Sequence, residues 1–156
     1  MAWSNSKVFA ATVTDVLNNT TAIDLNADTI KCALYDNDIT PDNTVASANT
    51  AYNAGQWAIA GNEVTSTGEW DAGGVALTSV TSSFTSTTYT FDAANTPSAA
   101  AATITNAYGC LIYDDTLTTP VADQGISYNY LGGANSVTGG VFTVVYSASG
   151  IYTIAF

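Results

Sequence analysis

The sequence predicts a mostly β protein, an antiparallel β-sandwich or barrel preceded by one amphipathic helix near the N-terminus. Three observations lead to this fold class. Short segments rich in β-branched and aromatic residues are separated by Gly, Asn, Asp, Ser or Pro, and a helical period is found near the start of the chain. The chain is also rich in Thr and poor in Lys and Glu, which suits strands better than helices. At 156 residues it has the length of one ordinary domain, which we expect to span residues 1–156.

The helix is predicted from about residue 4 to residue 18, with Ser4 or Asn5 as its N-cap and Asn18 at its end. Because the segment is short and contains several β-branched residues, we expect it to be stable only when it docks on a sheet. Its apolar side chains share one face, and they are Val8, Phe9, Val13, Val16 and Leu17.

Seven or eight short strands are expected after the helix. The first covers residues 29–35, and a polar stretch follows in which residues 43–52 favour a short helix. A strand at residues 56–64 is a weaker prediction. The remaining strands are predicted at 75–82, 84–92, 101–113, 124–131, 140–147 and 150–156.

Two of these segments predict how the strands are buried. Ile126, Tyr128 and Tyr130 alternate with polar residues, a pattern typical of a strand with one buried face. The last two segments, 140–147 and 150–156, are apolar on both faces. They are expected to form a hairpin at the centre of the sheet or, alternatively, to have one face covered by a neighbouring subunit.

The charge of the chain excludes several partners. Lys7 and Lys31 stand against 13 acidic residues, which gives a formal net charge of −11. Nucleic-acid binding draws much of its affinity from Lys and Arg that displace phosphate counterions, so DNA and RNA are not expected partners. An anionic membrane surface is disfavoured for the same reason. No signal peptide or membrane-spanning segment is predicted, so we expect synthesis in a cytoplasm and a soluble product.

The composition also disfavours catalysis. The chain has no His and no Arg, which removes the commonest general base and the bidentate anion clamp. Glu63, Glu69 and Asp71 lie close to Trp70, so a glycosidase that stacks a sugar on the indole is one alternative. Acidic residues beside a Gly-rich turn are more often turn formers. We therefore predict no enzyme, no catalytic residues and no cofactor.

Metal binding is weighed at two places. The oxygen-bearing run 36–42 resembles a calcium loop, but Pro41 stands where an EF-hand needs Gly and Ser47 where it needs Glu, so Asx-type turns are favoured. Cys32 and Cys110 cannot complete a four-ligand zinc site without histidine. They are expected as small buried residues, with a disulfide as the alternative if their strands are neighbours. No metal site is predicted.

A protein without catalytic or metal-binding groups is expected to act by packing against other proteins. Large apolar residues near both ends of the chain are the candidate contact residues, because such residues dominate the binding energy of interfaces. The predicted interface residues are Trp3, Val8, Phe9, Tyr152 and Phe156.

Strings distributed nearly end to end also carry a family resemblance, which is weakest at residues 40–60. They are Ser4–Phe9, Thr21–Lys31, Ala33–Tyr35, Asn62–Val64, Gly73–Gly74, Ala107–Gly109, Tyr113–Asp115 and the closing strand pair. In these strings the chain resembles small virion structural proteins of tailed phages, especially those that infect actinobacteria.

The resemblance implies a capsid decoration protein on the surface of the phage head. Its partners would be the major capsid protein and copies of itself, commonly as a homotrimer seated where capsid subunits meet. Some similar small β proteins belong to the tail instead. A tail-associated receptor- or carbohydrate-binding module that uses Trp70 and its neighbouring loops is therefore the alternative.

Overall fold

Two long antiparallel strands, β7 (Ala102–Asp114) and β8 (Gly125–Gly140), run through the centre of the structure, a computed structural model that describes residues 3–156. On the other side of β7 lies β2 (Ile30–Tyr35). The short strands β1 (Lys7–Val8) and β3 (Val75–Ala76) complete a five-stranded sheet in the order β1-β8-β7-β2-β3.

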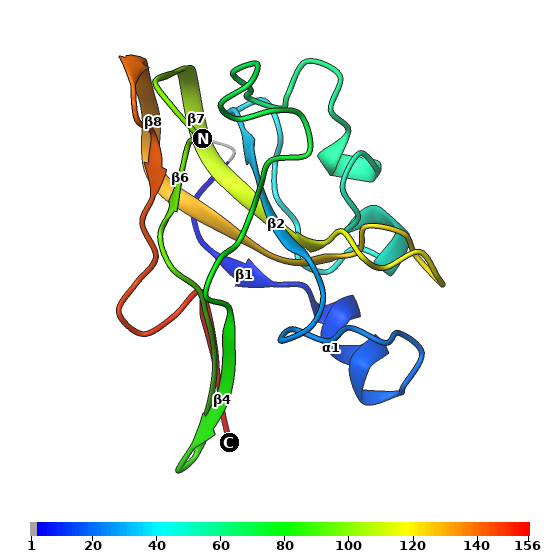
Figure 1. Cartoon of the computed structure of the whole chain (residues 1–156). Coiled ribbons are helices and arrows are strands. Elements are labelled where there is room, and N and C mark those ends of the chain that lie inside the picture. Colours follow the sequence, from blue (N-terminus) through cyan, green and yellow to red (C-terminus); the bar gives the residue numbers. More distant parts are fainter. Residues whose placement is uncertain (1–2) are drawn as a thin grey trace.

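In Figure 1 a smaller sheet in the order β10-β5-β4 projects downward from the large sheet, and α1 lies to the right of it, also below the large sheet. A third sheet contains only β6 and β9, and all strand pairs of the three sheets are antiparallel. The remaining elements are α1 (Ala10–Leu17), the 3₁₀ turns η1 (Ser47–Asn49) and η2 (Gly55–Trp57), and the strands β4 (Thr81–Thr85), β5 (Thr88–Asp92), β6 (Thr96–Pro97), β9 (Thr143–Val144) and β10 (Tyr152–Ala155).

This architecture confirms the predicted fold class, a mostly β chain with antiparallel sheets and one α-helix near the N-terminus. In the described part of the chain the strand order of each sheet is open, and no sheet closes into a barrel. None of the helices within residues 3–156 has the length and apolar character that crossing a bilayer requires.

The large sheet is buried on both of its faces, because alternate residues of β2 and β7 point to two separate hydrophobic clusters. Cys32 and Leu34 point to the first cluster, and Ala33 and Tyr35 point to the second. The first cluster is aliphatic, with Trp70, Phe91 and Phe142 packed into it. The second is aromatic and includes Trp3, Phe9, Trp57, Tyr113 and Tyr128.

The predicted helix at 4–18 begins too early. Lys7 and Val8 pair with Tyr128 and Ser127 of β8, and α1 begins only at Ala10. The backbone of Phe9 at the helix N-cap is extended, and no side chain caps the helix. The strand pairing of this segment outweighs its helical periodicity, which is a weak signal in a chain rich in β-branched residues.

The last two strands do not form a central hairpin. β9 pairs with β6, whereas β10 pairs with β5 and lies at the edge of the three-stranded sheet. In place of a strand, the segment 56–64 begins inside η2 and has an isolated bridge between Tyr35 and Glu63. The apolar runs at 140–147 and 150–156 are compatible with an edge strand as well as with a central one. Hydrophobic periodicity indicates a strand but does not identify the strands with which it pairs.

The alternation of Ile126, Tyr128 and Tyr130 is interrupted by a bulge. Ser127 pairs with Ile112, but Tyr113 pairs with Gly125, so Ile126 has no direct partner. The extra residue turns Ile126 into the first cluster, while Tyr128 and Tyr130 belong to the second.

Candidate functional site

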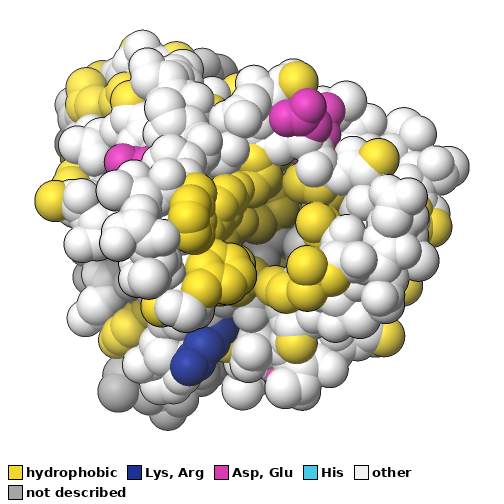
Figure 2. Space-filling view, turned by 90° about the horizontal axis from the view of Figure 1, so that it is seen from below, with side chains coloured by type: hydrophobic (Ala, Val, Ile, Leu, Met, Phe, Trp, Pro, Cys, Tyr) yellow, Lys and Arg dark blue, Asp and Glu magenta, His cyan; other side chains and the backbone are white. Residues whose placement is uncertain are grey.

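An open apolar groove of about 550 Å³ lies between α1, the loop that follows it and the three-stranded sheet. Hydrophobic side chains gather around this hollow, which Figure 2 shows from below. Of the described residues that line it, Asp24 alone is charged. The apolar groove is lined by Val8, Val13, Val16 and Leu17, by Ile23 and Leu25 of the loop, by Tyr89, Tyr152 and Ile154 of the sheet, and by Ile126.

The helix forms one wall because it is attached to the sheet through polar contacts. The Thr12 hydroxyl donates to the carbonyl of Gly125, and Thr12 is the buried residue of the helix. The Asp15 carboxylate accepts hydrogen bonds from the Ser47 hydroxyl at 2.6 Å and from the Gln124 amide at 2.9 Å. These hydrogen bonds lower the pKa of Asp15, and the bond from Ser47 has the largest effect. The apolar side of the helix is left facing the groove, where Leu17 is 80% exposed.

The opposite wall is the apolar face of the β10-β5-β4 sheet. Tyr89 lies opposite Ile154 and also opposite Phe84, so all three side chains share one face. Towards the end of the hairpin this face emerges into solvent, where the rings of Phe84 and Phe156 pack at a centroid distance of 5.8 Å. Phe84 is 61% exposed and Phe156 79%.

The predicted interface residues fall into two groups. Val8 and Tyr152 are half-buried and line the apolar groove, and Phe156 is exposed beside it. Trp3 and Phe9 are fully buried in the aromatic cluster and offer no surface to a partner. The Trp3 indole also donates a hydrogen bond to the carbonyl of Asp36 at 2.6 Å. Trp3 is therefore a core residue, although it lies near the start of the sequence.

The carboxylates near Trp70 accept hydrogen bonds from different parts of the chain. Glu63 accepts the Tyr52 hydroxyl at 2.9 Å and the Gly73 amide at 2.8 Å, whereas Glu69 accepts the Ser66 hydroxyl at 3.2 Å. Burial raises the pKa of Glu63, and the two hydrogen bonds partly offset this effect. Each carboxylate therefore has a structural partner within its own turn or a neighbouring one.

Trp70 cannot stack on a sugar ring in this structure. Its side chain is fully buried and packs edge-on against Phe142 at 5.9 Å. The prediction that Trp70 presents its ring to a sugar is therefore wrong, because the turn that carries Trp70 folds the indole into the first cluster.

The run 36–42 forms Asx turns, as the sequence favours. The Asp36 carboxylate accepts the amide of Asp38 at 2.9 Å, and that of Asp42 accepts the amide of Thr44 at 2.8 Å. Within residues 3–156, no group of three or more His, Cys, Asp or Glu side chains has the spacing of a metal site.

Cys32 and Cys110 are free, buried and located on the paired strands β2 and β7. Their side chains are in hydrogen-bonding contact, which together with burial raises the pKa of Cys110. The two strands are thus neighbours, which is the condition for a disulfide between them, but in this structure the pair serves as small core residues.

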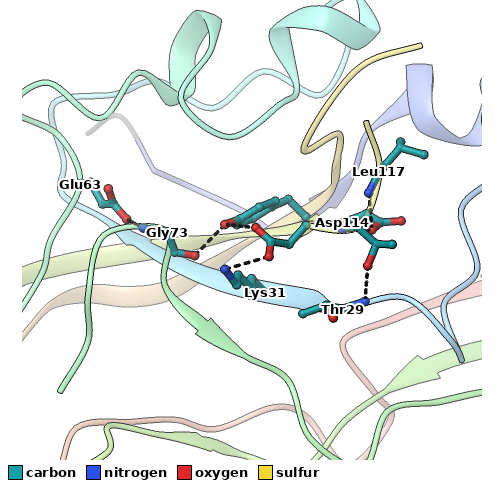
Figure 3. Close-up of polar contacts among 9 residues, drawn as sticks. Thr29, Lys31, Glu63, Gly73, Asp114 and Leu117 are labelled. Atoms are coloured by element: carbon teal, nitrogen blue, oxygen red, sulfur yellow. Dashed lines mark hydrogen bonds and ion pairs between the residues drawn. The ribbon is translucent and has the colours of Figure 1, made fainter. Parts of the chain in front are cut away.

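A polar network that the sequence did not predict connects β2, β7 and the Gly73 turn (Figure 3). Lys31 forms a salt bridge with Asp115 at 2.9 Å, and the Tyr113 hydroxyl donates to the carbonyl of Gly73 at 2.8 Å. At the end of β7, Asp114 is a fully buried carboxyl group. Burial is the main cause that raises its pKa to about 6. The repeated pattern of Tyr followed by Asp at 35–36 and 113–114 could have pointed to these strand ends.

Comparison with protein-family models, with curated proteins and with solved structures finds no match to this chain.

Proposed function

We propose that this chain is a structural protein of a tailed-phage particle that decorates the head by docking on the major capsid protein. The observation that carries the proposal is the apolar groove, an open hydrophobic surface with one charged residue in a chain of net charge −11. Contiguous exposed apolar surface in a protein is typical of a docking site. The resemblance of its sequence strings to such virion proteins supplies the identity of the partner.

Exposed apolar side chains in the groove and beside it would supply binding energy for docking. Leu17, Phe84 and Phe156 each have more than half of their surface exposed. Burying one such side chain contributes about 1.5–3 kcal/mol, so three of them contribute roughly 5–9 kcal/mol before the entropy cost of association. Repeated over many copies, this binding would raise the barrier to disruption of the shell.

The rigid β body fits the same role. A decoration protein must transmit load between capsid subunits without unfolding, and a sheet buried on both faces is expected to resist local opening. A homotrimer is part of the proposal, and sedimentation equilibrium distinguishes it from a monomer of 16.1 kDa.

The test compares particles with and without the protein. Particles assembled without it should release their genome at a lower temperature or in lower salt than complete particles, and adding purified protein should restore the difference. Equal stability of the two kinds of particle would contradict the cementing role. Immunogold labelling that decorates the tail and leaves the head bare would contradict the location.

A pair of variants tests the surface. Leu17→Ser in the apolar groove should weaken binding to particles at least tenfold, because it removes an exposed apolar contact without disturbing the fold. Val145→Ser is the matched control, since Val145 is 68% exposed but lies outside the groove. Equal loss of binding in both variants would place the contact elsewhere.

The tail-associated carbohydrate-binding alternative has less support, because the aromatic residue on which it depended is buried. A glycan-array screen with the intact protein tests it directly. Binding to a defined glycan, abolished by changes outside the apolar groove, would favour this second role.

A further inference from the structure

The end of β7 contains a buried carboxylate whose hydrogen bonding is incomplete. Asp114 is fully buried, and its Oδ1 accepts the amides of Thr116 at 2.9 Å and Leu117 at 3.2 Å (Figure 3). Its Oδ2 is buried and has no hydrogen-bond partner. An unpartnered buried carboxylate oxygen is costly, because desolvation is not compensated by any donor.

A second carboxylate, from the loop between α1 and β2, lies beside the Asp114 carboxyl group. The carboxyl group of Asp28 lies close enough to that of Asp114 to add to the effect of burial in raising the pKa of Asp114. The Oδ2 atom of Asp28 accepts the amide of Asp24 at 2.7 Å, and Asp24 in turn accepts the amides of Asn26 and Ala27. The loop is thus held in a shape that presents Asp28 to Asp114.

No side chain of the described residues supplies the positive charge that such a pair needs. The chain has no Arg or His, and the one salt bridge within residues 3–156 joins Lys31 to Asp115. Two ionised carboxylates in contact repel each other, and neither can donate a hydrogen bond. A cation from solution removes both penalties.

We propose that Asp28 and Asp114 bind a calcium ion at the junction of the 24–28 loop and the end of β7. Two carboxylates balance the charge of a divalent ion, and calcium accepts irregular sets of oxygen ligands that include hydroxyls, carbonyls and water. The exposed hydroxyl of Thr116 is close by, since it accepts the amide of Thr29 at 2.7 Å. With only two carboxylates, we expect a dissociation constant on the order of 10⁻⁴ to 10⁻³ M.

The site would act on the apolar groove, although it does not depend on the proposed function. Ile23 and Leu25 belong to the same loop and line the groove. Bound calcium would fix this loop to β7 and so hold one wall of the groove in place.

The experiment uses the full chain freed of metal with EDTA and dialysed at pH 7.5. Calorimetric titration with calcium chloride should give heat that saturates in the millimolar range. Ten millimolar calcium should raise the melting temperature by about 3–5 °C, the shift expected for a ligand well above its dissociation constant.

Variants locate the site. Asp114→Asn should lose the heat and the shift of melting temperature, yet melt no lower than the wild type without calcium, because its amide can donate to Asp28 while Oδ1 keeps its two bonds. Asp28→Asn, in the half-buried loop position, should also lose the response. Asp38→Asn is the control with the same change of charge in an exposed turn, and it should respond like the wild type.

Two results would overturn the proposal. One is a wild-type protein that gives no heat and no shift up to 10 mM calcium, which would mean that the two carboxyl groups share a proton instead. The other is a calcium response that persists in both Asp114→Asn and Asp28→Asn. Particle-stability measurements are not involved, so failure here leaves the proposed decoration role untouched.

Discussion

Trp3 is held by contacts on every side, although it lies near the chain end. Its ring packs against Trp57 at 5.8 Å and Tyr128 at 5.9 Å, and its indole N–H reaches the carbonyl of Asp36. The ring also lies directly over Gly109 of β7, where a Cβ atom would come within 2.3 Å of it. The glycine thus creates the space in which the indole rests.

Gly109→Ala should therefore destabilise the fold by about 1–3 kcal/mol, because the new methyl group overpacks a filled site. Urea unfolding measures the effect. Gly140→Ala is the control in the partner strand, where the added Cβ meets only a terminal methyl of Val137. Equal stability of the two variants would mean that Trp3 moves aside at little cost.

The buried carboxyl group of Glu63 should make the free energy of unfolding depend on pH. Burial raises its pKa above the ordinary value of 4.5, so the folded state binds this proton more tightly than the unfolded chain. The free energy of unfolding contributed by Glu63 therefore falls as pH rises from about 4.5 through the raised pKa. Glu63→Gln should remove this component.

The measurement is the difference in unfolding free energy between wild type and Glu63→Gln at several pH values from 4 to 7. This difference isolates Glu63 from Asp114, whose pKa is also raised, and from Asp15, whose pKa is lowered. A difference that stays constant over the range would show that Glu63 does not titrate as its burial requires.

At the scale of elements, α1 shows why periodicity alone misplaces a helix. Val13, Val16 and Leu17 of the predicted apolar face line an open groove, whereas Phe9 of the same predicted face is buried in the aromatic cluster. Attachment depends on Thr12 and Asp15, whose partners Gly125 and Gln124 lie more than a hundred positions away in sequence. No local pattern encodes such partners.

Thr12→Val tests this attachment, because it keeps the shape of the side chain and removes the hydroxyl. The variant should be destabilised by roughly 1–2 kcal/mol, since the Gly125 carbonyl loses a buried donor. Thr14→Val makes the same chemical change on the exposed face of α1 and should change the stability by less than about 0.5 kcal/mol. Thermal unfolding followed by circular dichroism compares the two, and a larger loss in Thr14→Val would contradict the assignment.

The strands were predicted unevenly for a related reason. β2 and β7 were placed within one residue, because their apolar runs are long and bounded by turn residues. β8 was expected to end at 131 but continues to Gly140, through a glycine-rich stretch whose pairing depends on β7. Of the five predicted interface residues, Val8 and Tyr152 line the groove and Phe156 is exposed, whereas the burial of Trp3 and Phe9 follows only from tertiary packing.

For the whole molecule, the dominant property is its charge. With 13 acidic residues against two lysines the chain has a net charge of −11, so its carboxylates repel one another, and this repulsion disfavours the compact state at low ionic strength. Raising sodium chloride from about 10 to about 150 mM shortens the screening length from about 30 to about 8 Å. The melting temperature should rise by roughly 2–4 °C.

Differential scanning calorimetry in buffers that contain EDTA tests this without interference from divalent ions. Replacing the exposed Asp38 and Asp71 together by Asn should reduce the salt dependence. A melting temperature that is flat or falls with salt would mean that local pairs outweigh the net charge.

The pairing of early strands with late ones has a consequence for synthesis on the ribosome. β1 and β2 emerge first, but their partners in the large sheet, β8 and β7, begin only at Gly125 and Ala102. Until the last third of the chain has been made, Trp3 and Phe9 have no completed pocket to enter. Folding of the large sheet must therefore wait until β7 and β8 have been synthesised, and a chain terminated before them would expose its most apolar residues in the crowded cell.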